Sequence, residues 1–270
     1  MADEQKYRYF AEISFKGTRY HGWQIQKNAI SVQEVLNERF SSILREEIQV
    51  TGAGRTDTGV HALYYVGHFD SIRENLHADI SFLYHINQFL PSDISVYRIL
   101  PVKNDAHARF SAISRTYEYR ICRRKNPFLQ EYAWMFYREL NVEAMQNACG
   151  YLVGKHDFSS FCKVHSGART HVCAVEEAEW TEKEDMLIFR ITADRFLRNM
   201  VRAIVGTMIE IGKEALSPDE LHDILEAHNR SEAGVLHGLH IQFSVKHPGI
   251  FLKEGIFSAA YPVFICARNG

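Results

Sequence analysis

The hydrophobic positions along this 270-residue chain follow a period of two in some stretches and of about 3.6 in others, which predicts strands and helices in alternation. Ser31 and Glu34 form a capping box just before apolar residues at helical spacing, so a helix is expected to begin there. The elements expected up to residue 105 are a strand over 7–15, a helix after Ser31, strands near 48–53 and 62–69, a helix after Asp79 and a strand over 94–100. Their order is β-α-β-β-α-β.

The second half of the chain repeats this order. Its expected elements are a strand over 115–122, a helix over 142–152, strands near 172–180 and 186–193, a helix from about 195 to 211, a short helix after Ser217 and a strand over 239–245, with an extra strand near 132–137. Two such units in tandem predict an α+β fold, with two ferredoxin-like (βαββαβ) halves whose sheets join across a central active-site cleft. The junction is expected within residues 101–108.

The composition suits a folded protein. Hydrophobic residues make up 46% of the chain, which is enough for a sizeable core. The first residues include acidic side chains with no apolar run behind them, and no apolar stretch reaches membrane-spanning length, so we expect no signal peptide and a cytoplasmic protein. The five cysteines are spread without a framework spacing, which is typical of reduced thiols.

Residues 52–62 are the first candidate for a functional site. They place one carboxylate, Asp57, among glycines, small hydroxyl residues and Arg55. Glycines on a turn let the backbone approach a ligand, and a neighbouring arginine favours the ionised, nucleophilic form of an acid. Asp57 is therefore the first catalytic candidate.

Two other interpretations of this segment stay open at this point. Glycine, aspartate and threonine are also the usual residues of a tight turn between strands. Asp57-Thr58-Gly59 is, in addition, the tripeptide that carries the catalytic aspartate of aspartic proteases, whose two carboxylates share one proton. The chain holds no second Asp-Thr-Gly or Asp-Ser-Gly, and its helical patterns do not suit those mostly β enzymes.

Basic residues gather in two places although the formal net charge is only -2. That charge argues against a protein coated with cations, but phosphate contacts need only a local basic surface. The clusters are Arg120, Arg123, Arg124 and Lys125 after one expected strand, and Arg195, Arg198 and Arg202 along one face of an expected helix. Each cluster also suits a solvated charged surface.

Aromatic residues accompany cations between residues 16 and 24. Arg19 and Lys27 could meet phosphates while an aromatic ring stacks on a base; we expect Trp23 to pack into the core instead. On the strand over 115–122, Arg115 and Tyr117 share a face, where a tyrosine could stack under a base or be an ordinary half-buried residue.

Signatures of cofactors are missing from the sequence. Cys162, His165, His171 and Cys173 have the chemistry of zinc ligands, but structural zinc sites show tighter paired spacing. The chain has no His-Glu-x-x-His, Gly-x-Gly-x-x-Gly or Gly-x4-Gly-Lys-Ser/Thr segment. We therefore expect catalysis by side chains alone, with no metal and no cofactor.

Five segments resemble, in order, the TruA family of tRNA pseudouridine synthases: 17–24, 52–62, 108–119, 154–161 and 196–206. The resemblance assigns catalytic roles to Asp57 (the essential aspartate), Arg55 (its motif arginine), Tyr117 (the active-site tyrosine) and Arg202 (the basic residue that pairs with the aspartate). It implies a metal-free homodimeric isomerase that acts on uridines 38, 39 and 40 of the tRNA anticodon stem-loop. Asp57 would be the nucleophile or the base.

The resemblance also guides the expected contacts and domains. The residues expected to bind the RNA are Leu239, Arg19, Lys27, Thr56, His61, Arg115, Arg123, Arg124, Arg195 and Arg198. We expect residues 1–105 to carry the catalytic aspartate and residues 106–270 to complete the active site and the dimer interface.

The chain departs from the family pattern in places. Lys16, Asn199 and His171 stand where the family usually has Asp, His and Arg, and residues 232–239 lack the usual Thr-Ala-Pro run before Gly-Leu. The last departure affects the match of Leu239. The alternative is a non-catalytic RNA-binding protein with two RRM-like modules, which the same element order and aromatics would suit. Such a surface gains nothing from Asp57, and no strand carries the RRM aromatic motif.

Overall fold

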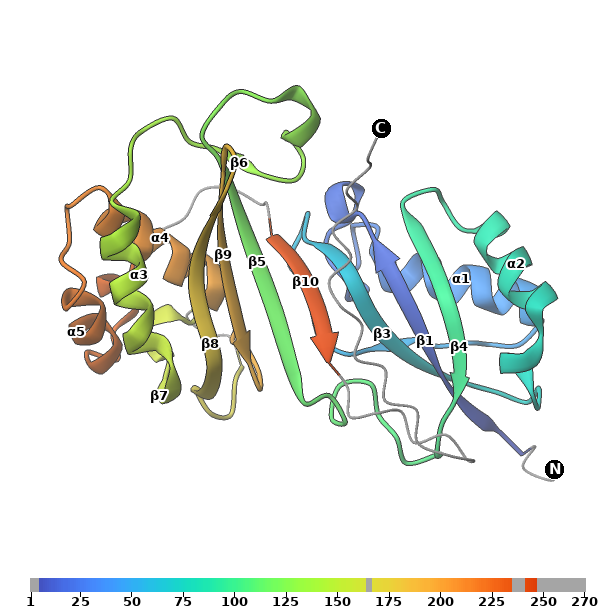
Figure 1. The fold of residues 1–270 in the computed structure, drawn as a ribbon. Coiled ribbons are helices and arrows are strands. Elements are labelled where there is room, and N and C mark those ends of the chain that lie inside the picture. The colour runs from blue at the N-terminus through green and yellow to red at the C-terminus, as the bar shows by residue number, and fades with distance from the viewer. Residues whose placement is uncertain (1–4, 164–166, 235–240, 247–270) are drawn as a thin grey trace.

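A computed structural model describes residues 5–163, 167–234 and 241–246 and has an α+β fold built on one mixed sheet (Figure 1). The strands are β1 (Tyr7–Phe15), β2 (Thr51–Gly52), β3 (His61–Ser71), β4 (Ile94–Pro101), β5 (Ser114–Cys122), β6 (Trp134–Met135), β7 (Gly154–Asp157), β8 (Val172–Lys183), β9 (Met186–Ala193) and β10 (Ile241–Lys246). The α-helices are α1 (Val32–Leu44), α2 (Ile80–Phe89), α3 (Val142–Cys149), α4 (Met200–Gly212) and α5 (Glu220–Glu226). The predicted α+β class is confirmed.

The sheet joins two ferredoxin-like halves edge to edge. The strand order is β4-β1-β3-β10-β5-β9-β8-β7, with β2 beside β3 and β6 beside β5. β10 is the last strand of the second half, and it pairs antiparallel with β5 and parallel with β3. β10 therefore fills the seam between the halves and makes one continuous sheet.

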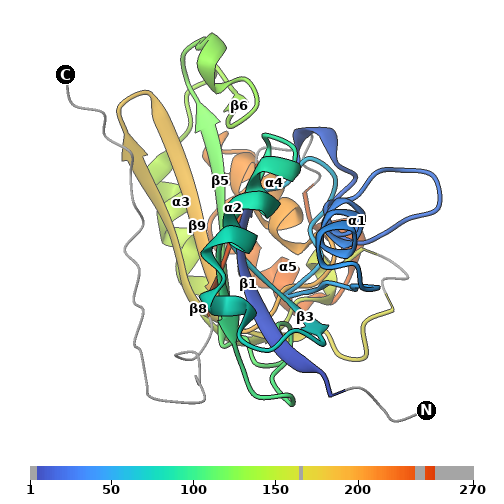
Figure 2. The same ribbon diagram turned by 90° about the vertical axis from the view of Figure 1, so that its right-hand side faces the viewer.

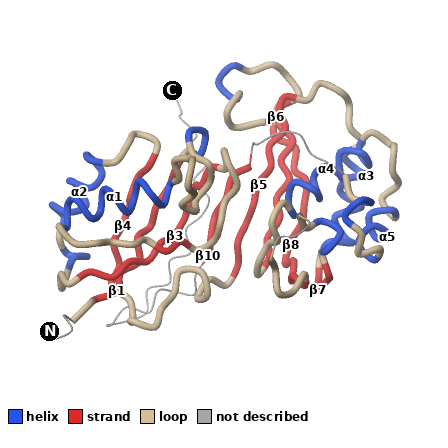
Figure 3. The backbone as a smooth tube through the Cα atoms, turned by 180° about the vertical axis from the view of Figure 1, so that it is seen from behind, coloured by secondary structure: helices blue, strands red, loops and turns tan. Residues whose placement is uncertain are grey.

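Helices cover one face of this sheet. Figure 3 shows α1, α2 and α4 from the helix side, and the edge view of Figure 2 places α1 to one side of β1. Ser31 Oγ accepts the Glu34 N–H at 3.2 Å, so the predicted capping box satisfies an amide that would otherwise be unpaired at the start of α1. Below this cap, α1 buries one side chain per turn against the core: Val32, Leu36, Phe40 and Leu44.

The start of α4 differs from the prediction. The helix begins at Met200 rather than near residue 195, because Asn199 has a φ of 70°, a left-handed conformation that does not continue an α-helix. Residues 195–199 therefore form a non-helical segment before α4, and its last two residues are a turn. The predicted helical stripe of Arg195, Arg198 and Arg202 is wrong, since only Arg202 lies on α4.

The connection between the halves is held by two histidines. His68 of β3 accepts the Ala108 N–H at Nδ1, over 3.2 Å, and its ring centroid lies 4.5 Å from that of His107. Burial, assisted by the charges of His107 and Arg8, lowers the pKa of His68 to about 4. At neutral pH the His68 ring is thus uncharged, and its Nδ1 can accept this hydrogen bond.

Acid is expected to destabilise the fold through His68. The unfolded chain protonates this residue below about pH 6.5, whereas the folded chain protonates it only near pH 4. The contribution of His68 to the free energy of unfolding should therefore be complete above pH 6.5. It should fall as the pH drops to about 4 and stay constant below that pH. The two pKa values set an upper limit of roughly 3 kcal/mol on this fall.

Urea unfolding of His68→Asn at pH 7.5 and pH 4.5 measures this contribution. The asparagine amide oxygen replaces the acceptor but does not titrate, so the variant should lose much less stability than the wild-type protein between the two pH values. His77→Asn, at an exposed histidine, is the matched control and should behave like the wild-type protein. An equal fall in His68→Asn and in the wild-type protein would contradict the assignment.

Candidate active site

Asp57 lies in a cleft of about 630 Å³ that is lined by both halves of the chain. The first half supplies residues 53–60, which connect β2 to β3. The second half supplies the start of β5 with the turn before it, and residues 195–202 at the entrance to α4. His21, Gln24 and Gln26 of the first half, and Gly167 and Ala168 of the second, also line the cleft. The predicted candidate segment therefore sits where several separate parts of the chain meet.

Two glycines shape the loop that carries Asp57. The Trp23 ring stacks on Tyr65 with centroids 4.2 Å apart, which confirms the predicted core position of Trp23. A Cβ on Gly52 would lie only 2.1 Å from Tyr65 Oη, and one on Gly22 would lie 2.1 Å from the Thr56 carbonyl oxygen. Because side chains at these positions would clash, glycine is what lets the 17–24 segment pack against the loop and fix it.

Asp57 faces Arg202 across the cleft. Its Oδ2 lies 3.7 Å from Arg202 Nη2, and the side chains are 39% and 20% exposed. Among the described residues, the buried Nε and Nη2 of Arg202 have no hydrogen-bond acceptor. These two nitrogens can therefore donate hydrogen bonds to a ligand. The pair is thus an ion pair without a direct hydrogen bond, and it leaves room for a substrate group to reach the carboxylate.

Tyr117 lies beside this ion pair on β5. Its ring meets Phe196 edge to face, with centroids 4.8 Å apart. Burial raises the pKa of Tyr117 well above its ordinary value, and the negative charge of Asp57 raises it further. The hydroxyl is therefore protonated at neutral pH, which places a neutral aromatic ring and a hydrogen-bond donor next to the carboxylate.

The cleft is strongly basic although the whole chain is slightly acidic, with a net charge of -2. Its arginines are Arg55, Arg109, Arg115, Arg195, Arg198 and Arg202. Asp57 is the acidic residue of the described lining. A concave surface with this positive charge attracts a polyanion, and the electrostatic field of the arginines is strong at Asp57.

Arg115 ties the lining segments together. It donates from Nη1 to the Asp194 carbonyl over 2.7 Å and from Nη2 to the carbonyls of Ala53, over 3.1 Å, and Arg109, over 2.6 Å. Burial lowers the pKa of Arg115. One guanidinium thus connects the Asp57 loop, the turn before β5 and the segment before α4. Thr56 also lines the cleft, with its side chain buried.

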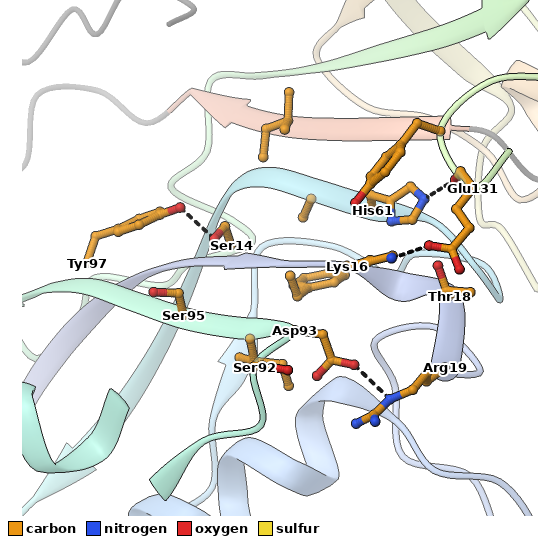
Figure 4. A pocket seen from close by; sticks show the side chains of 15 residues that line it. Ser14, Lys16, Thr18, Arg19, His61, Ser92, Asp93, Ser95, Tyr97 and Glu131 are labelled. Carbon is orange, nitrogen blue, oxygen red and sulfur yellow. Dashed lines mark hydrogen bonds and ion pairs between the residues drawn. The ribbon is translucent and has the colours of Figure 1, made fainter. Parts of the chain in front are cut away.

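Two residues predicted to bind RNA lie elsewhere. Arg19 and His61 line a separate pocket of about 610 Å³, and Figure 4 shows Arg19 directed at Asp93, with an Nε–Oδ2 distance of 2.8 Å. His61 accepts the Gly17 N–H at Nδ1, and its Nε2 lies 2.7 Å from the Glu131 carbonyl oxygen. His61 does not belong to the described lining of the Asp57 cleft, and its ring nitrogens contact Gly17 and Glu131.

Three other predicted contacts, Arg123, Arg124 and Lys27, do not belong to the described lining of the Asp57 cleft. Arg123 and Arg124 follow the far end of β5, where Arg123 pairs with Glu182 and Arg124 lies 3.5 Å from Asp185. Lys27 is exposed in the loop before α1 and does not belong to the described lining of the cleft. Leu239 lies outside the described residues.

The cleft also contains residues that sequence reasoning missed. Arg109 and Phe196 both line the cleft, although the sequence pattern gives neither of them a place in the site. For Arg109 the available signal was its place directly before the aromatic Phe110. In the described ranges, no group of three or more His, Cys, Asp or Glu side chains could hold a metal ion, and His165 of the zinc hypothesis lies outside those ranges. Nor does any described helix have the length and apolar character to cross a bilayer.

Comparison with known proteins gives consistent matches. A family model described as tRNA pseudouridine synthase matches residues 148–240. The chain is 47% identical to tRNA pseudouridine synthase A of Bacteroides fragilis over 84% of this chain and 90% of that protein. It is 44% identical to the protein of the same name from Porphyromonas gingivalis, over 91% of this chain and 99% of that protein. Similarity thus extends over nearly the whole length of these relatives.

Proposed function

Because this chain belongs to the tRNA pseudouridine synthase A family, and is thus an isomerase that converts uridine to pseudouridine in tRNA, we propose that it acts in the anticodon stem-loop, at positions 38, 39 and 40. The specificity rests on the family resemblance. The observation that best supports a catalytic centre here is the Asp57–Arg202 ion pair, in a cleft whose described lining contains five further arginines and no other acid.

The reaction changes the uracil atom that is bonded to the ribose C1′, from N1 to C5. The glycosidic bond between N1 and C1′ breaks, the detached base rotates, and C5 bonds to C1′. The C5 hydrogen leaves as a proton and N1 gains one, so the product is an isomer of the substrate. We assign Asp57 the central role, as nucleophile or base, because it is the carboxylate of the described cleft.

Neighbouring side chains supply a positive charge, an aromatic ring and phosphate contacts for this reaction. Arg202 places a positive charge 3.7 Å from the carboxylate, and its unpaired donors can bind a substrate oxygen. Tyr117 offers its ring to pack against the flipped base. Flipping a uridine out of its stack costs a few kcal/mol, and phosphate contacts of Arg55, Arg195 and Arg198 at the cleft offset this cost.

Both halves of the chain contribute residues to the proposed active site. Residues 1–105 carry Asp57, and residues 106–270 contribute Tyr117 and Arg202. We further propose that the protein is a homodimer, as the resemblance implies, which sedimentation velocity would reveal as a mass near twice 31.2 kDa. The sheet face opposite α1, α2 and α4, turned to the viewer in Figure 1, is a surface on which a second copy could pack.

Release of tritium from tRNA labelled at uridine C5 tests the function directly. Joining C5 to C1′ expels the C5 hydrogen, so the purified protein should release tritium into water, in chelator as well as without it. A transcript carrying label only at positions 38–40 tests the specificity. No release from this transcript, with release from uniformly labelled tRNA, would move the target site; no release from either, with tRNA still bound, would favour the non-catalytic RNA-binding alternative.

A further inference from the structure

The turn at residues 107–111, just before β5, is unusually well fixed for a segment at a cleft edge. His107 Nδ1 accepts the Arg109 N–H over 3.1 Å, and Ser111 Oγ accepts the His107 N–H over 3.0 Å. Ala108 donates its N–H to His68 Nδ1 on β3, and Ser111 donates its own to the His107 carbonyl. Side-chain and backbone acceptors thus bind the N–H groups of His107, Ala108, Arg109 and Ser111.

Two tilted ring contacts continue this arrangement from the core to the surface. The His107 ring centroid lies 4.5 Å from that of buried His68 and 4.4 Å from that of Phe110. The Arg109 guanidinium carbon lies 5.7 Å from the Phe110 ring centre. Phe110 is nevertheless 76% exposed. A phenyl ring is therefore held in a fixed orientation, with a cation beside it and one side open to solvent.

Arg109 differs from the predicted RNA-binding arginines that lie outside the cleft. Arg19, Arg123 and Arg124 each lie beside a carboxylate, whereas Arg109 forms no ion pair with any described residue and lines the same cleft as Asp57. Its charge is thus available to a ligand of the cleft. A fixed aromatic ring next to an available cation is the arrangement that binds single-stranded nucleic acid, through base stacking and phosphate contact.

We propose that residues 107–111 form a second RNA contact beside the catalytic cleft, in which Phe110 stacks on an unpaired base next to the flipped uridine and Arg109 binds a backbone phosphate. This inference rests on the proposed function, because the RNA must lie in the cleft. It adds a binding element that positions the strand and takes no part in the bond changes. The His68–His107 pair supports it from within the fold.

Two substitutions separate the two contacts. Phe110→Ala should weaken tRNA binding by roughly 5- to 100-fold through lost stacking, with the slope of log Kd against log salt unchanged, and Phe110→Tyr should restore affinity. Arg109→Gln should weaken binding and reduce that slope by about 0.7 to 0.9, the value for one phosphate contact. Phe128→Ala, at a phenyl ring that is 86% exposed, and Arg138→Gln, at an exposed arginine, are the matched controls and should bind like the wild-type protein.

The outcomes distinguish this proposal from the function on which it rests. Filter binding of tRNA at several salt concentrations measures affinity, and tritium release by the wild-type protein measures the activity separately. If the wild-type protein releases tritium and Phe110→Ala binds like Phe128→Ala, the second contact is overturned while the function stands. If Phe110→Ala instead changes the mass in sedimentation, the ring is covered by a second copy of the chain, and the RNA contact is likewise overturned.

Discussion

Asp57→Ala is expected to lower the rate of pseudouridine formation by at least about 10⁴-fold, the loss that follows when a residue central to the bond changes is removed. Its carboxylate faces the Arg202 guanidinium in a cleft whose described lining contains no other acid, so no neighbouring group can take its place. Tritium release from C5-labelled tRNA, in single-turnover experiments with enzyme in excess, measures the rate of this step without contribution from product release.

Binding of tRNA should survive the same change. The substitution removes a negative charge from a basic surface that faces phosphates, so Kd should be equal to or lower than that of the wild-type protein. Asp57→Asn, which keeps the shape without the charge, should be equally inactive. Asp185→Ala is the control, because Asp185 pairs with Arg124 beyond the far end of β5; it should keep full activity. A rate in Asp57→Ala close to that of the wild-type protein would remove this residue from the mechanism.

Capping residues in the sequence predict correctly where α1 and α2 begin. Ser31 and Asp79 cap α1 and α2 as expected, because a side-chain acceptor three residues before an amide fixes where a helix begins. The start of α4 was predicted too early. Phe196 and Leu197 fit a helical period, but Asn199 adopts a left-handed conformation that periodicity does not detect.

The position of β10 could not be predicted from local pattern. Its alternating residues indicate a strand, but nothing in them specifies a parallel pairing with β3 on one side and an antiparallel pairing with β5 on the other. That choice depends on how the sheet edges of the two halves meet, which is a property of the assembled fold. It is also what brings the Asp57 loop within reach of Tyr117 and Arg202.

The sequence likewise predicts some positions in the site and not others. Asp57, Tyr117 and Arg202 come from distant parts of the chain and meet in one cleft, as the family resemblance implies. His61 lies only four positions after Asp57, yet its ring contacts the carbonyl of Glu131 in another pocket. Spacing along the chain does not reveal on which side of a strand a bulge directs each residue, and β3 shifts register near its start.

Arg202→Met should lower kcat by about 100-fold, the typical cost of removing one preorganised charged donor from an active site, with a much smaller change in KM. Its guanidinium lies 3.7 Å from Asp57 Oδ2, and its buried Nε and Nη2 have no acceptor among the described residues. These donors are therefore available to charge that develops as the glycosidic bond breaks. Arg202→Lys, which keeps the charge but loses the planar fork, should recover only part of the rate.

The comparison that isolates this role uses Arg198, which lines the same cleft but is exposed in the turn before α4. Arg198→Met should weaken tRNA binding and its salt dependence while leaving single-turnover kcat near the wild-type value, because a phosphate contact acts equally on ground and transition states. Arg202→Met should show the reverse. Its methionine fits the apolar surroundings of α4, whose residues are almost all buried, so the unfolding midpoint should hold and the loss cannot be ascribed to misfolding. A wild-type kcat in Arg202→Met would reduce the ion pair with Asp57 to a structural contact.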